Sequence, residues 1–242
     1  MPRHRKVPLA SLRCRYRFPD PETGVGEHGV IGVGPLLDPD TVLVAYHLGI
    51  FPWPAPDMEA DLVFWCSPDP RAVLRLDGPL HWSRSLRRSM RSKPFRVTLD
   101  EAFADVMDGC GDRREGTWIT ASLRTCYLRL FEMGWAHSLE VWNTRTGELA
   151  GGIYGLAIGS VFVAESMFHR ETDASKVAFA TLAETLRGDY ELLDAETMNP
   201  HLESLGCVTM PRSEYLELLV RARRRRVEFP EAPVTPAREG GR

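Results

Sequence analysis

Residues 138–168 read SLEVWNTRTGELAGGIYGLAIGSVFVAESMF and predict three successive β-strands. Apolar or alternating runs over 138–143, 149–157 and 161–168 are separated by turn residues, a pattern typical of a β-hairpin that continues into a third strand. Glycines inside the second run indicate bulges or close backbone approach within the sheet. This stretch therefore predicts a chain built around an antiparallel sheet.

The elements outside this stretch make the predicted fold mixed. Helical periodicity indicates helices near 100–108 and over 121–133, and Asp173 caps a further helix that runs to about Arg187 and is stopped by Gly188. Strand pattern follows over 190–196. This order of hairpin, strand, capped helix and strand resembles the core of GNAT-like acyltransferase folds. We therefore expect an α+β protein with a mixed, largely antiparallel sheet flanked by helices.

The first part of the chain is expected to form a small unit of its own. Asp38 and Pro39 supply the cap and first-turn proline of a helix. The prolines of GIFPWPAP, residues 49–56, predict a stiff loop without regular structure that carries Trp53. We expect a small N-terminal domain at 1–71 with a flexible start over 1–17, a GNAT-like catalytic domain at 72–229, and a disordered tail at 230–242.

The composition is that of a folded globular protein. Of 242 residues, 43% are hydrophobic and 26% charged, with a net charge of -3, which excludes disordered and fibrous classes. No apolar stretch approaches the roughly 20 residues that cross a bilayer, and the basic start lacks the apolar run of a signal peptide. The five cysteines are odd in number and form no CxxC pair, and the histidines lack metal-binding spacing. We therefore expect a cytoplasmic protein with reduced thiols, without a membrane span, a metal or a cofactor.

A basic segment over 81–96 contains six Lys or Arg residues and no acidic residue. Its arginines recur at helical offsets of three and four, and Trp82, Leu86 and Met90 recur every four residues on the opposite side. The pattern predicts an amphipathic helix with a basic outer face. That face is either a polyanion-binding surface or simply solvated.

Carboxylates lie within two of the predicted strands. Glu165 has apolar neighbours on both sides, and a period of two places it on the same face as Val163 and Met167. Asp194 and Glu196, two residues apart, share a face of the later strand. If these faces meet, they form an acidic site that suits a cationic substrate and the proton of an amine. The alternative is structural: a strand-end cap, or a buried pair with Lys176 or an arginine.

The turn that would hold coenzyme A in a GNAT-like enzyme is not recognisable here. Such enzymes bind the pyrophosphate on a glycine-rich turn at a helix N-terminus, whereas the segment over 166–176 contains no glycine. We therefore favour an activated acyl group carried on another polyanion, which the basic helix would bind.

Nine short motifs together resemble one known family. They are AYHLGIFPW (45–53), SPDPR (67–71), SRSLRR (83–88), EGTWIT (115–120), GWAHSLEVW (134–142), GGIYG (151–155), ESMF (165–168), DASK (173–176) and HLESLG (201–206). In this order, over about residues 18–220, the chain closely resembles leucyl/phenylalanyl-tRNA–protein transferases. Members of that family move Leu or Phe from aminoacyl-tRNA to proteins that begin with Arg or Lys, marking them for degradation by the N-end rule. The resemblance implies the same donor and acceptors here.

The resemblance also implies roles for individual residues. Glu165 would bind the basic N-terminal residue of the acceptor, Asp194 would hydrogen-bond its amine, and Glu196 occupies the position of the family's usual glutamine. The implied contacts to the terminal adenosine are Trp53, Trp118, Tyr46 and Tyr127. The implied lining of the aminoacyl pocket, which fits ordinary core equally well, is Ile153, Phe162, Met167, Leu182 and Leu193. The implied basic surface for the tRNA acceptor end is Arg84, Arg87, Arg88 and Arg91.

Three departures from the family pattern qualify this interpretation. Glu196 adds a charge and removes an amide donor, so it is either protonated when it works or binds the cationic acceptor. Ala164 replaces the glycine before ESMF and leaves open whether Leu or Phe is the preferred donor. GPLL at 34–37 stands in place of the usual GGDL.

We expect direct attack of the acceptor amine on the tRNA-bound ester, without a covalent enzyme intermediate. Cys66, Cys110, Ser166 and His169 show no triad spacing and are interpreted as structural. Two alternatives remain: an acyl-CoA N-acyltransferase and a non-catalytic tRNA-binding protein.

Overall fold

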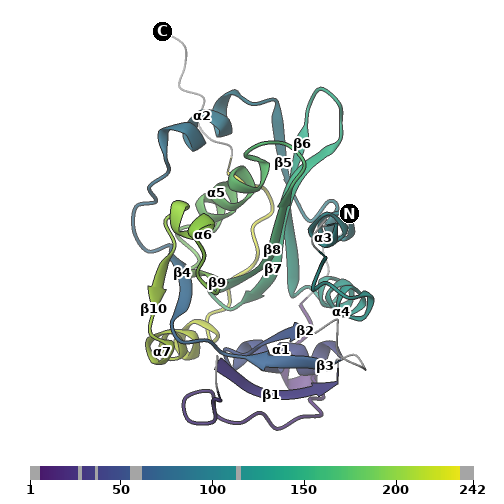
Figure 1. Cartoon of the computed structure of the whole chain (residues 1–242), viewed down its shortest axis with the longest axis vertical. Helices are drawn as coiled ribbons and strands as arrows, with labels where there is room; N and C mark the ends of the chain where they lie inside the picture. The colour runs from purple at the N-terminus through teal and green to yellow at the C-terminus, as the bar shows by residue number, and fades with distance from the viewer. Residues whose placement is uncertain (1–5, 27–28, 36–37, 55–61, 113–115, 235–242) are drawn as a thin grey trace.

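The computed structural model describes residues 6–26, 29–35, 38–54, 62–112 and 116–234. Two sheets organise these residues, a small one near the N-terminus and a large one that spans most of the chain (Figure 1). Within the described part, no helix is long and apolar enough to cross a membrane.

The N-terminal unit is a three-stranded antiparallel sheet with one helix. Its strand order is β1-β3-β2. Its elements are the 3-10 helix η1 (Leu9–Ser11), β1 (Val30–Pro35), α1 (Pro39–His47), β2 (Phe51–Pro54) and β3 (Leu62–Cys66). The predicted start of α1 is confirmed, because the Asp38 side chain accepts a hydrogen bond from the Thr41 N–H at 3.0 Å.

The expectation of a loop without regular structure at the prolines was wrong. Pro52 and Pro54 lie in β2, which pairs with β3 only, at the edge of the small sheet. An edge strand tolerates proline because the missing N–H would otherwise face away from the sheet. Trp53 is therefore held by a strand, directly opposite Phe64.

The large sheet has seven strands in the order β10-β4-β9-β8-β7-β6-β5. The strands are β4 (Arg71–Arg75), β5 (Phe95–Leu99), β6 (Ala136–Asn143), β7 (Leu149–Ile158), β8 (Val161–His169), β9 (Leu192–Glu196) and β10 (Val208–Met210). Only β8 and β9 pair in parallel, and every other pair within this sheet is antiparallel. The predicted α+β class, and the hairpin that continues into a third strand, are confirmed. Strands β4 and β5 were not predicted.

Helices cover both faces of the large sheet. They are α2 (Arg84–Ser92), α3 (Phe103–Gly111), α4 (Ala121–Glu132), α5 (Ala174–Leu186), α6 (Pro200–Ser204) and α7 (Arg212–Ala222). Helix α5 packs on one face with α2 beyond it, while α3 and α4 lie against the other face, beside the N-terminal unit (Figure 1). One apolar cluster therefore fills the side of α5, and a second runs continuously from the sheet into the N-terminal unit.

The expected boundary at 71/72 coincides with the start of β4, and the division into domains stays a prediction. The flexible start and disordered tail that we expected fall partly on 1–5 and 235–242, outside the described residues. In the described part, the Val7 N–H donates to the Met133 carbonyl and the Val234 N–H to Thr185 Oγ1, each at 3.0 Å. These two segments therefore make contacts with the body of the protein.

A β-bulge in β8 changes which face its residues present. Gly155 of β7 pairs with Ala164, but the preceding Tyr154 pairs with Ser166, so Glu165 is the extra residue. Glu165 lies on the same face of the sheet as Val163. Met167 lies on the opposite face, where it packs against the apolar cluster that contains α5. The expectation that Met167 and Glu165 share a face was therefore wrong, because the bulge resets the alternation.

Gly155 makes this bulge possible. A Cβ at this position would lie 2.0 Å from the Val163 carbonyl oxygen. We predict that Gly155→Ala lowers the free energy of unfolding by about 2 kcal/mol or more, because backbone must move to relieve the clash. Urea denaturation measures it. Gly32→Ala in β1 is the matched control, since a Cβ added at Gly32 would meet nothing within 4 Å. Equal stability of the two variants would contradict this account.

Candidate active site

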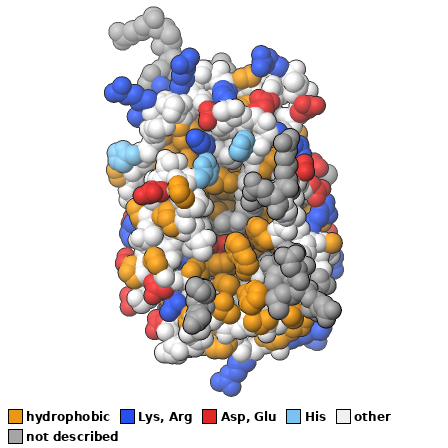
Figure 2. Space-filling view, viewed as in Figure 1, with side chains coloured by type: hydrophobic (Ala, Val, Ile, Leu, Met, Phe, Trp, Pro, Cys, Tyr) orange, Lys and Arg blue, Asp and Glu red, His pale blue; other side chains and the backbone are white. Residues whose placement is uncertain are grey.

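Three carboxylates gather where β8 and β9 separate. The parallel pairing of these strands ends at Val163 and Asp194, although β8 continues to His169 and β9 to Glu196. Glu165 and Glu196 each lie two residues beyond this last pair and act electrostatically on each other. In the view of Figure 2, the surface has a hollow near its centre, with hydrophobic and acidic side chains inside it. The faces that carry Glu165, Asp194 and Glu196 therefore meet, and a role for these carboxylates as a site stays a prediction.

Asp194 is held by a buried ion pair with Arg71 of β4. The Arg71 Nε and Nη2 donate to the Asp194 carboxylate at 2.9 and 2.7 Å, and the two side chains are 1% and 0% exposed. The guanidinium lies between the rings of Phe51 and Tyr215, 4.8 and 4.7 Å from their centroids. The Tyr215 hydroxyl and the Glu196 N–H also donate to Asp194, at 2.7 and 2.9 Å.

Asp194 thus adopts the structural alternative, a buried pair with an arginine. Its two oxygens already accept hydrogen bonds from Arg71, Tyr215 and the backbone of Glu196. A direct contact with an incoming amine stays a prediction and requires one of these bonds to open. What the structure gives Asp194 is a positioning role, because it fixes the backbone N–H of Glu196.

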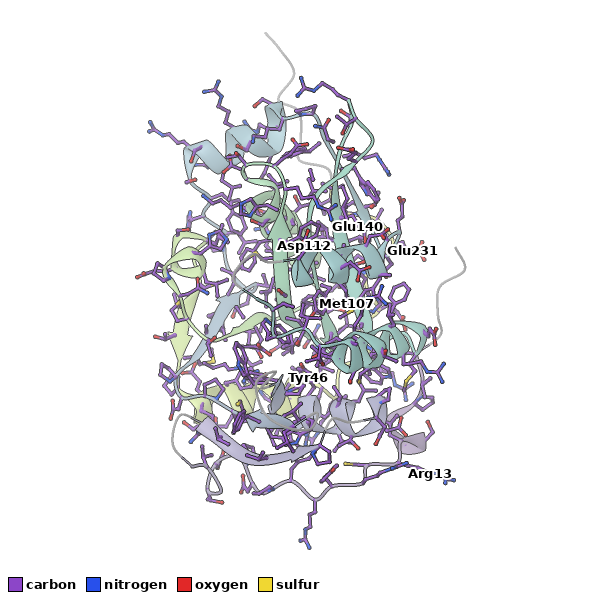
Figure 3. The ribbon with its side chains drawn as sticks, turned by 45° about the vertical axis from the view of Figure 1, so that its right-hand side comes forward. Arg13, Tyr46, Met107, Asp112, Glu140 and Glu231 are labelled. Atoms are coloured by element: carbon purple, nitrogen blue, oxygen red, sulfur yellow. The ribbon has the colours of Figure 1, made fainter. Side chains whose placement is uncertain are left out.

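Glu165 joins the two units of the protein through two tyrosines. Its Oε2 accepts a hydrogen bond from the Tyr127 hydroxyl of α4 at 2.7 Å, and that hydroxyl lies 2.5 Å from the Tyr46 hydroxyl of α1. Figure 3 shows Tyr46 where α1 meets the large sheet. The Oε1 of Glu165 is buried without a hydrogen-bond partner among the described residues. Burial raises the pKa of Glu165 to about 7, against the lowering effect of these hydrogen bonds.

Glu196 is the most strained residue of the site. Its φ is 63°, in the left-handed region that a residue with a Cβ seldom adopts. It is 6% exposed, and its Oε1 is buried with no partner in the described part of the chain. Burial, followed by the charge of Glu165, raises the pKa of Glu196 well above its usual value, and Arg71 opposes this shift. The surroundings of Glu196 therefore favour its protonated form.

Glu140, a buried carboxylate outside this group, shows the hydrogen bonding expected of a purely structural carboxylate. Glu140 of β6 is fully buried, and its oxygens accept hydrogen bonds from Thr98 and Ser138 (Figure 3). Each of its oxygens therefore has a partner, whereas Glu165 and Glu196 each keep one oxygen without one among the described residues. Sequence reasoning did not single out Glu140.

The predicted adenosine contacts divide into two groups. Trp53 and Trp118 are brought together and stack, with ring centroids 5.6 Å apart and planes 13° from parallel. Trp53 is 42% exposed, so a base has an aromatic face to stack on, but the contact between the rings leaves no space for a base between them. Tyr46 and Tyr127 are buried and hydrogen-bonded toward Glu165, so they support that carboxylate instead of presenting a free ring.

The predicted aminoacyl pocket is a closed cluster in this structure. The five side chains do come together on the side of α5, as Ile153, Phe162, Leu182 and Leu193 within the core and Met167 partly buried against it. The four core members are at most 1% exposed, as ordinary core residues are. Met167 alone remains accessible, and it lines a pocket at the end of β8.

The predicted basic helix is α2. Leu86 is buried and Trp82, just before the helix, donates from Nε1 to Glu184 Oε1 of α5 at 2.8 Å. The outer face carries four arginines that, with Ser92, line a groove of about 450 Å³: Arg84, Arg87, Arg88 and Arg91, all exposed. Figure 2 shows Lys and Arg side chains gathered at the end of the face that also carries the central hollow. The predicted amphipathic geometry is confirmed.

The structure also argues against a cysteine nucleophile. Burial, and then the charge of Glu196, raise the pKa of the Cys66 thiol to about 11, so it stays protonated at neutral pH. Among the described residues, no group of three His, Cys, Asp or Glu side chains is arranged to hold a metal ion.

Sequence reasoning missed Arg71, although it lies in the SPDPR motif. Its neighbours give no sign of its partner, which lies 123 residues further along the chain. An arginine at the start of an apolar strand was the available signal, since a buried guanidinium requires a buried carboxylate.

We predict strong coupling between Arg71 and Asp194. Arg71→Met alone leaves an unpaired buried carboxylate and should lower the free energy of unfolding by about 3–5 kcal/mol. Asp194→Leu alone should cost a similar amount, while the double variant should lose much less than the two together. Urea denaturation of all four proteins measures the cycle. Additive losses would show that the pair is not the source of stability.

Two family profiles match this chain. The leucyl/phenylalanyl-tRNA protein transferase profile covers residues 73–220, and the N-terminal domain profile of the same family covers 36–69. Among solved structures, a GCN5-related N-acetyltransferase from Sphaerobacter thermophilus aligns with a TM-score of 0.37 and 17% identity, over 71% of this chain and 53% of that one. So weak a likeness carries no argument.

Curated relatives are much more similar. A leucyl/phenylalanyl-tRNA–protein transferase from Shewanella sp. (strain ANA-3) is 45% identical over 226 residues, which is 91% of this chain and 90% of the relative. The protein of the same name from Stutzerimonas stutzeri (strain A1501) is 49% identical over 207 residues, 84% of this chain and 89% of the relative. The chain therefore belongs to the leucyl/phenylalanyl-tRNA protein transferase family.

Proposed function

We propose that this chain transfers Leu or Phe from aminoacyl-tRNA to the α-amino group of proteins that begin with Arg or Lys. The transfer would take place in the cytoplasm, without a metal or cofactor, and would mark the acceptors for degradation by the N-end rule. Family membership supports the reaction class. The observation that carries the proposal is the pair Glu165 and Glu196, two carboxyl groups that act on each other electrostatically, each with one buried oxygen that has no partner among the described residues.

The reaction needs positioning more than activation. The acceptor nitrogen forms a bond to the ester carbonyl carbon, the bond from that carbon to the ribose oxygen breaks, and a proton of the amine is finally transferred to that ribose oxygen, which becomes a hydroxyl. Glu165 suits the acceptor side, because Tyr127 fixes one of its oxygens and the other is left to accept from an ammonium or amine group. A negative charge there also favours a cationic Arg or Lys end.

Glu196 would act in its protonated form. A protonated carboxyl donates one hydrogen bond, which replaces the amide donor of the glutamine usual at this position. Burial and the neighbouring Glu165 favour this form by raising the pKa of Glu196. The donor would polarise the ester carbonyl and stabilise the oxyanion. The negative charge of the pair would then lie on Glu165.

The donor side would be bound by aromatic and basic surfaces. The exposed face of Trp53, backed by Trp118, suits stacking with the terminal adenine, which is worth about 1–3 kcal/mol for each base. The arginine face of α2 suits the phosphates of the acceptor end. The pocket for the Leu or Phe side chain would open by movement of Met167, the accessible member of the predicted set.

Transfer of a labelled amino acid tests the proposal. The protein is incubated with radiolabelled leucyl- or phenylalanyl-tRNA and with peptides that begin with Arg, Lys or Ala. We expect label on the Arg and Lys peptides and little on the Ala peptide. Transfer from acetyl-CoA to the same peptides would favour the acyl-CoA alternative. Tight tRNA binding with no transfer to any peptide would favour the non-catalytic alternative.

The two glutamates should respond differently to conversion into glutamine. We predict that Glu196→Gln keeps substantial activity because the amide still donates, whereas Glu165→Gln loses about tenfold or more in kcat/KM because an acceptor of the amine is lost. The two substitutions are isosteric, so each serves as the control for the other. Full activity of Glu165→Gln with an inactive Glu196→Gln would reverse the roles.

The pH dependence gives a separate test of the protonated Glu196. As pH rises through the raised pKa of Glu196, the wild-type protein loses its donor, while Glu196→Gln does not. The ratio of kcat/KM for Glu196→Gln over wild type should therefore increase as pH rises through the raised pKa of Glu196. Deprotonation of the substrate amine affects both proteins equally and cancels in this ratio. Parallel profiles would show that Glu196 does not work in protonated form.

A further inference from the structure

A pocket of about 370 Å³ lies at the end of β8, outside the carboxylate pair. It is lined by Met167, His169, Arg170, Ser175, His201 and Asp112, with backbone from α3 beside them. It is therefore built from the end of β8, the first turn of α5, the start of α6 and the end of α3. None of the roles assigned above uses these side chains except Met167.

Basic side chains predominate in this pocket. His169, Arg170 and His201 line it, and Lys176 is close enough to act electrostatically on His201. Burial, then Lys176 and His169, lower the pKa of His201, so its protonated form is disfavoured when no anion lies beside it. Asp112, which is exposed, is the one carboxylate among the described lining residues. An anion would oppose this lowering.

The first turn of α5 adds to this preference for an anion. Asp173 holds the N-cap position, but it has a φ of 70° and makes no side-chain capping hydrogen bond. Instead its carboxylate accepts a hydrogen bond from Ser89 of α2 at 2.8 Å. The first-turn N–H groups of a helix lack partners within the helix, and its positive dipole end favours negative charge. Ser175, in that turn, lines the pocket.

The pocket lies on a path between two parts of the proposed donor site. Met167 belongs both to this pocket and to the predicted aminoacyl cluster. On the other side, Ser89 of the basic helix and Lys93 just after it contact Asp173 and Thr172, in the loop that leads into α5. A strand of nucleic acid running from α2 to the carboxylates would therefore pass this pocket.

We propose that this pocket binds the phosphodiester that joins the terminal adenosine of the donor tRNA to the nucleotide before it. His169, His201 and Arg170 would contact the phosphate oxygens, together with the first turn of α5. This contact fixes the position of the ribose that carries the ester. The inference rests on the proposed function, because it assumes an RNA 3′ end as the donor.

Binding of unreactive fragments tests the pocket without any transfer step. Cytidylyl-(3′→5′)-adenosine contains the phosphodiester and adenosine lacks it, so the ratio of their dissociation constants isolates the phosphate contact. We expect the dinucleotide to bind about tenfold or more tightly in the wild-type protein, as charge-assisted hydrogen bonds to one phosphate would give. Isothermal titration calorimetry measures both constants.

Substitution of the histidines should remove this preference. In the double variant His169→Gln/His201→Gln the ratio should fall toward one, and Lys176→Gln should lower it by a smaller factor. His81→Gln is the matched control, since His81 is exposed and lies outside the pocket, and it should keep the wild-type ratio. Asp112→Asn should raise the ratio by removing the opposing charge.

Three outcomes would overturn the inference. The first is a wild-type protein that binds adenosine and the dinucleotide equally well. The second is an unchanged ratio in the double histidine variant. The third is a double variant that loses affinity for an Arg-initiated peptide and keeps the ratio, which would assign the pocket to the acceptor. A protein that fails in the transfer assay but shows the predicted ratio would instead contradict the proposed function alone.

Discussion

The buried pair of Arg71 and Asp194 is the interaction on which the rest of the site depends. It joins neighbouring strands of the large sheet, and the guanidinium is enclosed by Phe51 of the N-terminal unit and Tyr215 of α7. The large sheet, the N-terminal unit and α7 therefore all contact the guanidinium of Arg71. Because a buried guanidinium without its carboxylate is costly, these parts have one stable arrangement. That arrangement fixes the backbone of Glu196 in its left-handed conformation.

The acidic site arises from two irregularities in an otherwise regular sheet. The parallel strands β8 and β9 stop pairing after Val163, and the bulge adds Glu165 just beyond that point. Regular pairing there would leave no hollow. The separation leaves one oxygen of Glu165 and one of Glu196 buried without a hydrogen-bond partner among the described residues. In such surroundings charge and proton position have larger energetic consequences than they have in water.

Local sequence pattern predicted the regular helices and strands, but not the features that depend on contacts between distant parts of the chain. The hairpin, the third strand, α2 and the start of α1 follow from periodicity and capping, which act within a few residues. The strand at Pro52 and Pro54 was missed because its tolerance for proline depends on lying at an edge. The face of Met167 was wrong because the bulge depends on Gly155 in the partner strand.

The candidate site shows the same division between local and long-range information. Its three carboxylates were predicted from strand pattern, and the roles of its residues were inferred from the resemblance of short motifs. The partner of Arg71, and the support of Glu165 by Tyr127 and Tyr46, required coordinates. Each of these contacts joins side chains that lie tens of residues apart, and nothing in the flanking sequence of either partner specifies the other.

The hydroxyl chain from Tyr46 through Tyr127 to Glu165 crosses from the N-terminal unit into the large sheet. These bonds favour the ionised form of Glu165 by lowering its pKa, so sliding of one unit past the other would weaken them and drive the carboxylate toward protonation. The position of the two units relative to each other and the ionisation of Glu165 are therefore coupled. A bound RNA that contacts both units would, through the same hydrogen bonds, influence the pKa of Glu165.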